Sequence, residues 1–310
     1  MDVLADVLAA TKLGGAVTAH LTAAAPWAVR MDAMPKATFH AVVQGSCWLS
    51  RQGAEPVQLG GGDFVLLPTG VGHALSSAPG VALHPAAEVE AGAGRRTIRI
   101  DGTGSETQII CGAYRYDAFP SHPVLRMLPA LVHIPAGRSP DHRDLANTLR
   151  MLATELDDER PGAQTITDRL VDVVFVQVLR VWTATRAEAG ASWLAALRDP
   201  EISAVMALMH QRPAHPWTVE ELAGAVGVSR ATLARRFTAL VGEPPLAYLA
   251  RWRLELAARR LRDSANSVAA IGRSVGYLSE FSFSRAFKRA HGESPASYRL
   301  SHRSEDRARS

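Results

Sequence analysis

Residues 219–248 read VEELAGAVGVSRATLARRFTALVGEPPLAY, and residues 268–298 read VAAIGRSVGYLSEFSFSRAFKRAHGESPASY. The two stretches are copies of one pattern, offset by 49 residues up to Gly227 and Gly276 and by 50 residues beyond that turn. A repeat of fixed period indicates one supersecondary unit that is used twice. This repeat therefore decides the fold of the C-terminal third of the chain.

Each copy is predicted to form two helices joined by a short turn. Gly227 and Gly276 follow the last apolar position of the first helix, where a left-handed residue commonly ends a helix. Ser229 and Ser279 stand where a side-chain oxygen can cap the second helix. This arrangement is the helix-turn-helix, whose second helix enters the major groove of DNA. A long helix over residues 245–264 would join the two units and set them in successive grooves.

The charge of the chain is unevenly distributed. Residues 210–310 hold 17 of the 34 Lys and Arg residues and 9 of the 30 Asp and Glu residues, a net charge of +8. The other 209 residues hold 17 basic and 21 acidic side chains, a net charge of −4. A basic C-terminal third on a slightly acidic body favours a polyanion-binding module, although an ordinary solvated helical surface has the same composition.

Residues 217–299 resemble the DNA-binding domain of AraC/XylS-type bacterial transcription regulators, and residues 271–299 are similar to that family's signature. The resemblance implies double-stranded DNA and RNA polymerase as partners, a small-molecule or chemical effector, and a homodimer. By position it implies eight groove-facing residues, which are Arg230, Ala231, Ala234, Arg235, Glu280, Phe281, Ser284 and Arg285. Arginine in such positions suits bidentate contact with guanine. We expect Arg253, Lys288 and Arg289 to contact phosphates, which position the protein without reading sequence.

Short apolar runs separated by turn residues every 8–12 positions fill residues 38–115, a pattern typical of a small antiparallel barrel or sandwich. Residues 39–77 resemble a cupin-type sensor domain, and residues 62–73 read GDFVLLPTGVGH. In cupins the histidine of this motif, here His73, is a metal ligand inside the barrel. This chain departs from the metalloenzyme form, because Ser77 replaces the usual asparagine and the earlier H-x-H motif is reduced to His40. A catalytic cupin metal needs about three protein ligands and an open position, and that set is not visible.

A closed metal site is one interpretation of the remaining donors. His20, His40, His73 and Cys111 together would make a tetrahedral set for a divalent ion such as zinc. Cys111 could instead be a redox-sensing thiol if its pKa is lowered and it is exposed. Histidines on half-buried strands can also be ordinary core residues.

The sequence is expected to divide into three segments of an α+β protein. These are a cupin-like barrel at residues 1–123, a helical dimerisation and linker segment at 124–210, and the double helix-turn-helix domain at 211–310. Residues 165–186 are apolar enough to be buried on more than one side of a helix. Such a helix either packs against a partner subunit or is buried within its own domain.

The leading hypothesis for function is a sequence-specific, one-component transcription activator that responds to an effector, a metal or a redox change and has no enzymatic activity. The alternative is a metal-dependent cupin enzyme that carries an accessory DNA-binding tail. Two cysteines give no disulfide scaffold, and no run approaches the roughly 18 apolar residues of a membrane span. The N-terminus lacks the basic start of a secretory signal, so a cytoplasmic protein without membrane partners is expected.

Overall fold

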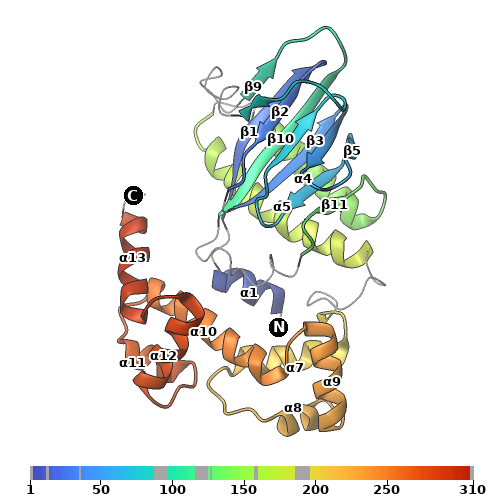
Figure 1. The fold of residues 1–310 in the computed structure, drawn as a ribbon. Helices are drawn as coiled ribbons and strands as arrows, with labels where there is room; N and C mark the ends of the chain where they lie inside the picture. Colours follow the sequence, from blue (N-terminus) through green and yellow to red (C-terminus); the bar gives the residue numbers. More distant parts are fainter. Residues whose placement is uncertain are drawn as a thin grey trace. The chain divides into compact units, whose positions relative to one another are not determined.

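The computed structural model of the chain describes residues 3–11, 14–34, 36–86, 97–115, 125, 128–156, 160–185 and 196–307. The chain forms two compact units. Leu13–Ala187 make up a β-rich unit, and Met1–Lys12 together with Glu188–Ser310 make up a helical unit (Figure 1). These findings confirm the predicted α+β fold class.

The described strands of the β-rich unit form two sheets. One sheet has six strands in the order β11-β6-β3-β10-β1-β9, and the other has five in the order β5-β4-β7-β2-β8. The strands are β1 (Gly14–Ala24), β2 (Ala28–Met31), β3 (Ala37–Gln44), β4 (Ser46–Arg51), β5 (Val57–Gly60), β6 (Phe64–Leu67), β7 (His73–Ser76), β8 (His84–Pro85), β9 (Thr97–Ile100), β10 (Glu106–Arg115) and β11 (Val132–Ile134).

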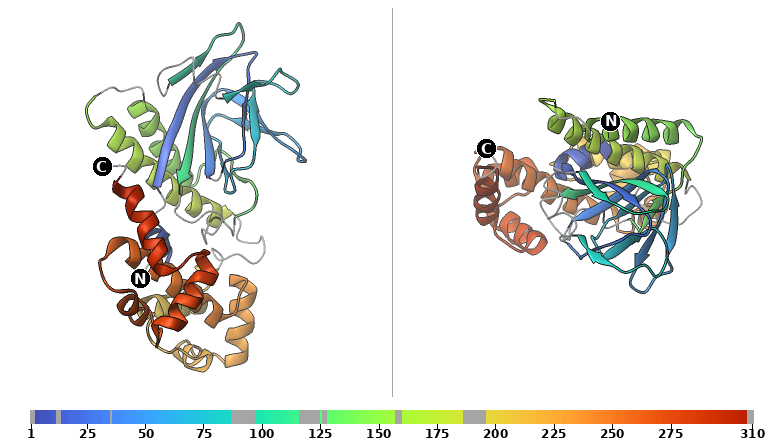
Figure 2. Two further views of the ribbon diagram at one scale, coloured as in Figure 1. Left: turned by 60° about the vertical axis from the view of Figure 1, so that its left-hand side comes forward. Right: turned by 90° about the horizontal axis from the view of Figure 1, so that it is seen from above.

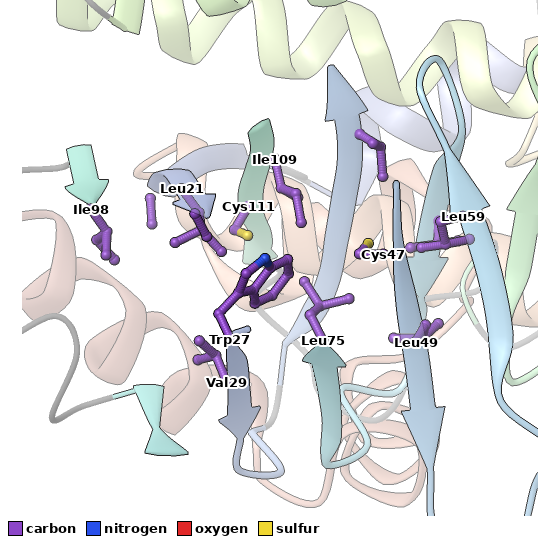
Figure 3. Close-up of a cluster of buried hydrophobic side chains, with 14 residues drawn as sticks. Leu21, Trp27, Val29, Cys47, Leu49, Leu59, Leu75, Ile98, Ile109 and Cys111 are labelled. Carbon is purple, nitrogen blue, oxygen red and sulfur yellow. The ribbon is translucent and has the colours of Figure 1, made fainter. Parts of the chain in front are cut away.

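The main apolar core of this unit lies against the inner faces of the strands. It includes Leu21, Leu75 and Cys111 from three separate strands and Trp27 from the residue before β2, which Figure 3 shows close together. The central strand β3 reads ATFHAVVQ and is buried at its first six positions rather than at alternate ones. A strand is buried at successive residues when both of its faces are covered. The second face of this sheet must therefore have its own cover.

Helices α4 (Pro140–Leu156) and α5 (Ala163–Thr185) provide that cover (Figures 1 and 2). The Tyr114 hydroxyl of β10 donates a hydrogen bond to the Val171 carbonyl of α5 at 3.1 Å, and the Tyr114 and Phe175 ring centroids are 4.8 Å apart. Gly15 of β1 permits the close approach, since a Cβ there would lie 2.1 Å from Val171 Cγ1. Thus much of the apolar surface of α5 is buried within its own unit.

The helical unit contains two similar groups of helices around one long connector. Its described helices are α1 (Val3–Thr11), α7 (Pro200–Gln211), α8 (Val219–Ala225), α9 (Arg230–Val241), α10 (Pro245–Asp263), α11 (Val268–Ser274), α12 (Glu280–His291) and α13 (Pro295–Arg307). The connector α10 has 19 residues and is about 28 Å long at 1.5 Å per residue. Helices α8 and α9 lie near one end of α10, and α11 and α12 lie near its other end (Figure 1).

The two units divide the chain differently from the three predicted segments. Helices α4 and α5 join the sheets because they pack on β1 and β3, and α7 joins the helical unit. The division falls near residue 187 instead of residue 210, and the predicted boundary at residue 123 lies outside the described residues. No helix in the described ranges is both long and apolar enough to cross a membrane.

Candidate DNA-binding surface and sensor cavity

The first helix-turn-helix consists of α8, a glycine turn and α9. Gly227 has a φ of +72°, as predicted for the end of α8, and the Ser229 hydroxyl accepts a hydrogen bond from the Thr232 amide at 3.1 Å. Leu233 and Phe237 are buried, which fixes the face of α9 that turns inward. The predicted reading positions can therefore be placed relative to this buried face.

The four predicted reading positions of α9 lie away from this buried face. Arg230, Ala231 and Arg235 are exposed, and Ala234 is half-buried. The next residue, Arg236, is different, because its guanidinium pairs with Asp199 at 2.8 Å and with Glu201. Arg235 is therefore available to a partner, whereas Arg236 fastens α9 to the start of α7.

The second helix-turn-helix repeats this construction in α11 and α12. Gly276 has a φ of +95°, and the Ser279 hydroxyl caps α12 by accepting from the Ser282 amide at 3.1 Å. Phe283 and Phe287 are fully buried four residues apart. The structure thus contains the predicted second unit with the same inward stripe.

The predicted reading residues of α12 are mostly open to solvent. Glu280, Phe281 and Arg285 are exposed, and Ser284 is half-buried. Lys288 and Arg289 are also exposed, as a phosphate contact requires.

Leu278 was not among the predicted contacts, yet its side chain is fully exposed in the turn before α12. Phe281, which was predicted, is also strongly exposed. Such large apolar side chains in the open suit contact with thymine methyl groups. The sequence does not distinguish Leu278 from Tyr277 of the same turn, whose ring packs on Phe283 with the two centroids 5.3 Å apart.

Arg253 differs from the other predicted contacts. Its Nε donates to the Pro213 carbonyl at 2.6 Å and its Nη2 donates to the His215 carbonyl at 2.7 Å. Burial lowers the pKa of this guanidinium. The structure uses Arg253 to hold residues 211–217 against α10, and the predicted phosphate contact would compete with these bonds.

The β-rich unit contains a cavity of about 260 Å³ between its strands. Most of its wall is apolar, with Leu21, Val29, Met31, Leu75 and Ile98 among the lining residues. At one part of the wall lie polar groups from β3, β7 and β10. These are Thr38, His40, His73 and Cys111, and the charged residues Arg30 and Asp32 also line the cavity. A cavity with apolar walls and few polar groups is the usual form of a small-molecule site.

Three of the four predicted metal donors meet at this cavity. Cys111 lies opposite His40 in the pairing of β10 with β3. His40 Nδ1 is 3.1 Å from Cys111 Sγ, and His40 Nε2 is 2.7 Å from His73 Nε2. His73 Nδ1 is 2.8 Å from the Val71 carbonyl oxygen. The four groups form a chain that runs from the thiol to a main-chain carbonyl.

The fourth predicted donor, His20, belongs to the other face of the sheet. The pairing of β1 with β10 is irregular between Val17 and Ala19, and beyond this bulge Ala19 pairs with Cys111 and His20 pairs with Ile110. Successive strand residues project to opposite faces. His20 therefore points away from Cys111, and it does not line the cavity that Ala19 and Leu21 line.

These positions do not fit the predicted zinc set. His40 turns its two nitrogens toward different partners, whereas a metal site needs donors that converge on one point. Among the described residues, no three His, Cys, Asp or Glu side chains are arranged to hold a metal ion. Metal binding stays a prediction from the cupin resemblance.

The electrostatic surroundings keep these imidazoles neutral. Burial, and to a smaller extent His73, holds the pKa of His40 well below its ordinary value. Burial also lowers the pKa of His73, although its hydrogen bond to Val71 opposes this and Arg51 reinforces it. The redox role of Cys111 stays a prediction, and its thiol is next to a neutral imidazole that can accept a proton.

Sequence comparisons place both units among known proteins. The sequence profile of the cupin family matches residues 2–184, and that of a helix-turn-helix domain matches residues 222–301. The chain is 39% identical over 304 residues to an AraC-like transcription regulator of Streptomyces antibioticus, covering 96% of this chain and 98% of that protein. It is 32% identical to the HTH-type transcriptional regulator AlkR of Acinetobacter baylyi, covering 96% and 99% of the two chains. The solved DNA-binding domain of AdpA in complex with a target DNA is 34% identical, covers 33% of this chain and 93% of that one, and gives a TM-score of 0.32.

Proposed function

Because the chain belongs to the AraC family of DNA-binding transcription regulators and carries a cupin domain, we propose that a small effector in the cupin cavity controls its DNA binding. The cavity is the observation that carries this proposal. Its volume of about 260 Å³ is enough for a compact organic molecule, and its wall offers a few polar groups for orientation. Contact with RNA polymerase, activation of transcription and a cytoplasmic location belong to the same proposal.

A substitution that fills the cavity tests this proposal before any effector is known. Ala113 lines the cavity, so Ala113→Phe would place a phenyl ring where an effector is expected. The matched control is Gln52→Phe, which adds the same ring at an exposed turn of the same unit. We expect Ala113→Phe to change the affinity for selected operator DNA by about 5- to 150-fold, the usual range of coupling between two sites. Equal affinities for both variants, with unchanged melting temperatures, would contradict control through this cavity.

The rival function, a metal-dependent cupin enzyme with a DNA-binding tail, gains no support from the site. Its chemistry would need convergent donors with an open position. His40, His73 and Cys111 are instead connected one to the next. The regulator interpretation accounts for both units of the chain.

A homodimer is the second part of the proposal. Ile166 and Val173 are exposed on α5, and Leu170 between them is half-buried. The spacing of four and three residues puts these side chains on one face of the helix. A second copy of the chain would cover this apolar stripe. Sedimentation should show a wild-type dimer that Val173→Glu weakens, and a wild-type monomer at micromolar concentration would contradict the assignment.

A further inference from the structure

In each hydrogen bond between the connected groups at the cavity wall, the donor and the acceptor can be assigned. The Val71 carbonyl only accepts hydrogen bonds, so His73 Nδ1 carries a hydrogen and, in the neutral ring, His73 Nε2 does not. His40 Nε2 must then donate to His73 Nε2, which leaves His40 Nδ1 with a lone pair. That lone pair faces Cys111 Sγ at 3.1 Å. The Cys111 thiol therefore has a proton acceptor that is oriented by a second histidine.

This arrangement is that of an activated nucleophile. A thiol, a histidine within hydrogen-bond reach and a third group that orients the histidine are the parts of such a device. Here the thiol also lines a cavity, so a molecule that enters the cavity can reach it. Cys111 is 9% exposed, while the other cysteine, Cys47, is 1% exposed and is not a lining residue.

A separate observation points to a ligand at the same wall. Within the described part of the chain, Thr38 Oγ1 is buried and has no hydrogen-bond partner, and Thr38 is 8% exposed. Thr38 and His40 are two residues apart on β3, so their side chains share the face that lines the cavity. A buried hydroxyl without a partner costs free energy. A ligand oxygen in the cavity would remove that cost.

We propose that Cys111 captures small apolar α,β-unsaturated carbonyl compounds by covalent addition, and that such compounds are the effector class of the cavity. This proposal rests on the proposed function and adds the chemistry of its effector. The apolar wall would hold the hydrocarbon part of the compound, and Thr38 would donate a hydrogen bond to its carbonyl oxygen.

The addition is balanced without another reactant. Cys111 Sγ forms a bond to the β carbon as its S–H proton passes to His40 Nδ1. The electron pair of the carbon–carbon double bond moves toward the carbonyl oxygen, where the Thr38 hydroxyl stabilises the enolate. His40 then returns the proton to the α carbon. A C–S bond and a C–H bond replace the S–H bond and the π bond, and nothing is oxidised or reduced overall.

The two cysteines of the chain provide an internal comparison. Burial, and then the charge of Asp63, raises the pKa of the Cys47 thiol to about 12. Figure 3 shows Cys47 and Cys111 at separate positions in the core. Only Cys111 has both a proton acceptor and access to the cavity, so modification should be selective.

The test uses the full chain with benzylideneacetone as the probe and its saturated analogue benzylacetone as the control. Intact-mass measurement should show one added probe molecule in the wild type and in Cys47→Ala, and none in Cys111→Ala. Peptide mapping of the wild type should place the adduct on Cys111, which does not depend on any variant folding. Benzylacetone should form no adduct but should slow the reaction by occupying the cavity.

Rates identify the roles of the neighbours. His40→Gln should slow capture on the order of 100-fold, the usual contribution of a positioned base. Thr38→Val should slow it about tenfold through the loss of one hydrogen bond, and Thr38→Ser should restore the rate. If Thr38→Ser does not restore the rate of capture, Thr38 has a purely structural role and its part in the proposal is wrong.

Three results would overturn covalent capture itself. The first is an adduct that is divided evenly between the two cysteines, and the second is the absence of an adduct under conditions in which benzylacetone raises the melting temperature. The third is a purified protein that holds one zinc ion per chain and loses it in Cys111→Ala. Operator binding of the unmodified wild type is measured separately. Its absence would contradict the proposed function, whereas a missing adduct with intact operator binding contradicts only the chemistry proposed here.

Discussion

Arg235 and Arg236 are neighbours on α9 with opposite surroundings, so single alanine substitutions should separate DNA reading from folding. Arg235 is exposed on the predicted reading face. Arg236 pairs with Asp199 and Glu201 at the start of α7. We expect Arg235→Ala to change base preference and Arg236→Ala to change stability.

The size of the first effect follows from the expected contact. A bidentate arginine–guanine pair contributes about 1–3 kcal/mol of discrimination, which corresponds to about 5- to 150-fold in affinity. The loss should be confined to one base position, because one side chain makes the contact. Arg235→Ala should leave the melting temperature nearly unchanged, since an exposed side chain holds no other element in place.

For Arg236→Ala the expected effect is a lower melting temperature with the base preference of the wild type. The Asp199 carboxylate also caps α7 by accepting from the Glu201 and Ile202 amides. Although burial opposes it, these bonds and Arg236 keep the pKa of Asp199 below its ordinary value. Removal of the guanidinium therefore weakens the attachment of α9 to α7 and not the surface that reads DNA.

The assay is fluorescence anisotropy at one fixed salt concentration, with an operator selected from a random DNA library and its single-base variants. Salt must be fixed because phosphate contacts make affinity depend steeply on it. If Arg235→Ala keeps the wild-type preference at every base position, Arg235 does not read a base. If Arg236→Ala changes the preference while its melting temperature stays unchanged, the separation of roles is wrong.

Further substitutions and pH test the structure around these surfaces. Phe283→Ala should destabilise the helical unit by about 3–5 kcal/mol, because a fully buried phenyl ring is removed, and equal denaturation midpoints would contradict this packing. Gly15→Val should destabilise the β-rich unit by roughly 1–3 kcal/mol or more, since even a Cβ would lie 2.1 Å from Val171 Cγ1; an unchanged free energy of unfolding would show that α5 does not pack there. Burial, and then the charge of Arg251, lowers the pKa of His210 to about 3, and this lowering outweighs the opposite effect of the Asp6 carboxylate, whose Oδ2 is 3.4 Å from His210 Nδ1. The unfolded chain therefore takes up a proton below about pH 6.5 that the folded chain refuses, and stability should fall as pH decreases from about 6.5 toward 3, by at most about 1.4 kcal/mol per pH unit. His210→Phe should reduce this slope in acid denaturation curves, and an unchanged slope would show that His210 does not cause it.

The two helix-turn-helix units and the helix that connects them could be predicted from the sequence, because their signals are local. Ser229 and Ser279 cap their helices, and Gly227 and Gly276 adopt positive φ angles. Caps, turns and stripes of buried residues act within a few positions of the chain, and each appears in the printed sequence. The AraC/XylS resemblance drawn from these residues is confirmed.

The role of Arg253 could not be predicted in the same way. Its position on the connector helix suggested an open cation. The carbonyls that it contacts belong to Pro213 and His215, about 40 residues earlier in the chain. Only the tertiary fold brings these groups together.

The cavity shows the other limit of sequence reasoning. The sequence indicated that His40 and Cys111 lie on strands, but the register that pairs them is set by the tertiary fold, and the position of His20 depends on a single irregularity between Val17 and Ala19. Without that bulge, His20 would project to the same face as Cys111, because a shift of one residue moves a side chain to the opposite face of a sheet. Thr38 could have been found, since it precedes His40 by two positions on the same strand.

The central claim is that two helix-turn-helix units read sequence under the control of the cupin cavity. The most direct test is a footprint of the wild-type protein on DNA selected from a random library, repeated after Ala113→Phe. We predict protection of two successive major grooves on one DNA face, about 10 base pairs apart, and a changed affinity for the same footprint in the variant. Binding that varies with salt but not with sequence, in both proteins, would contradict the claim.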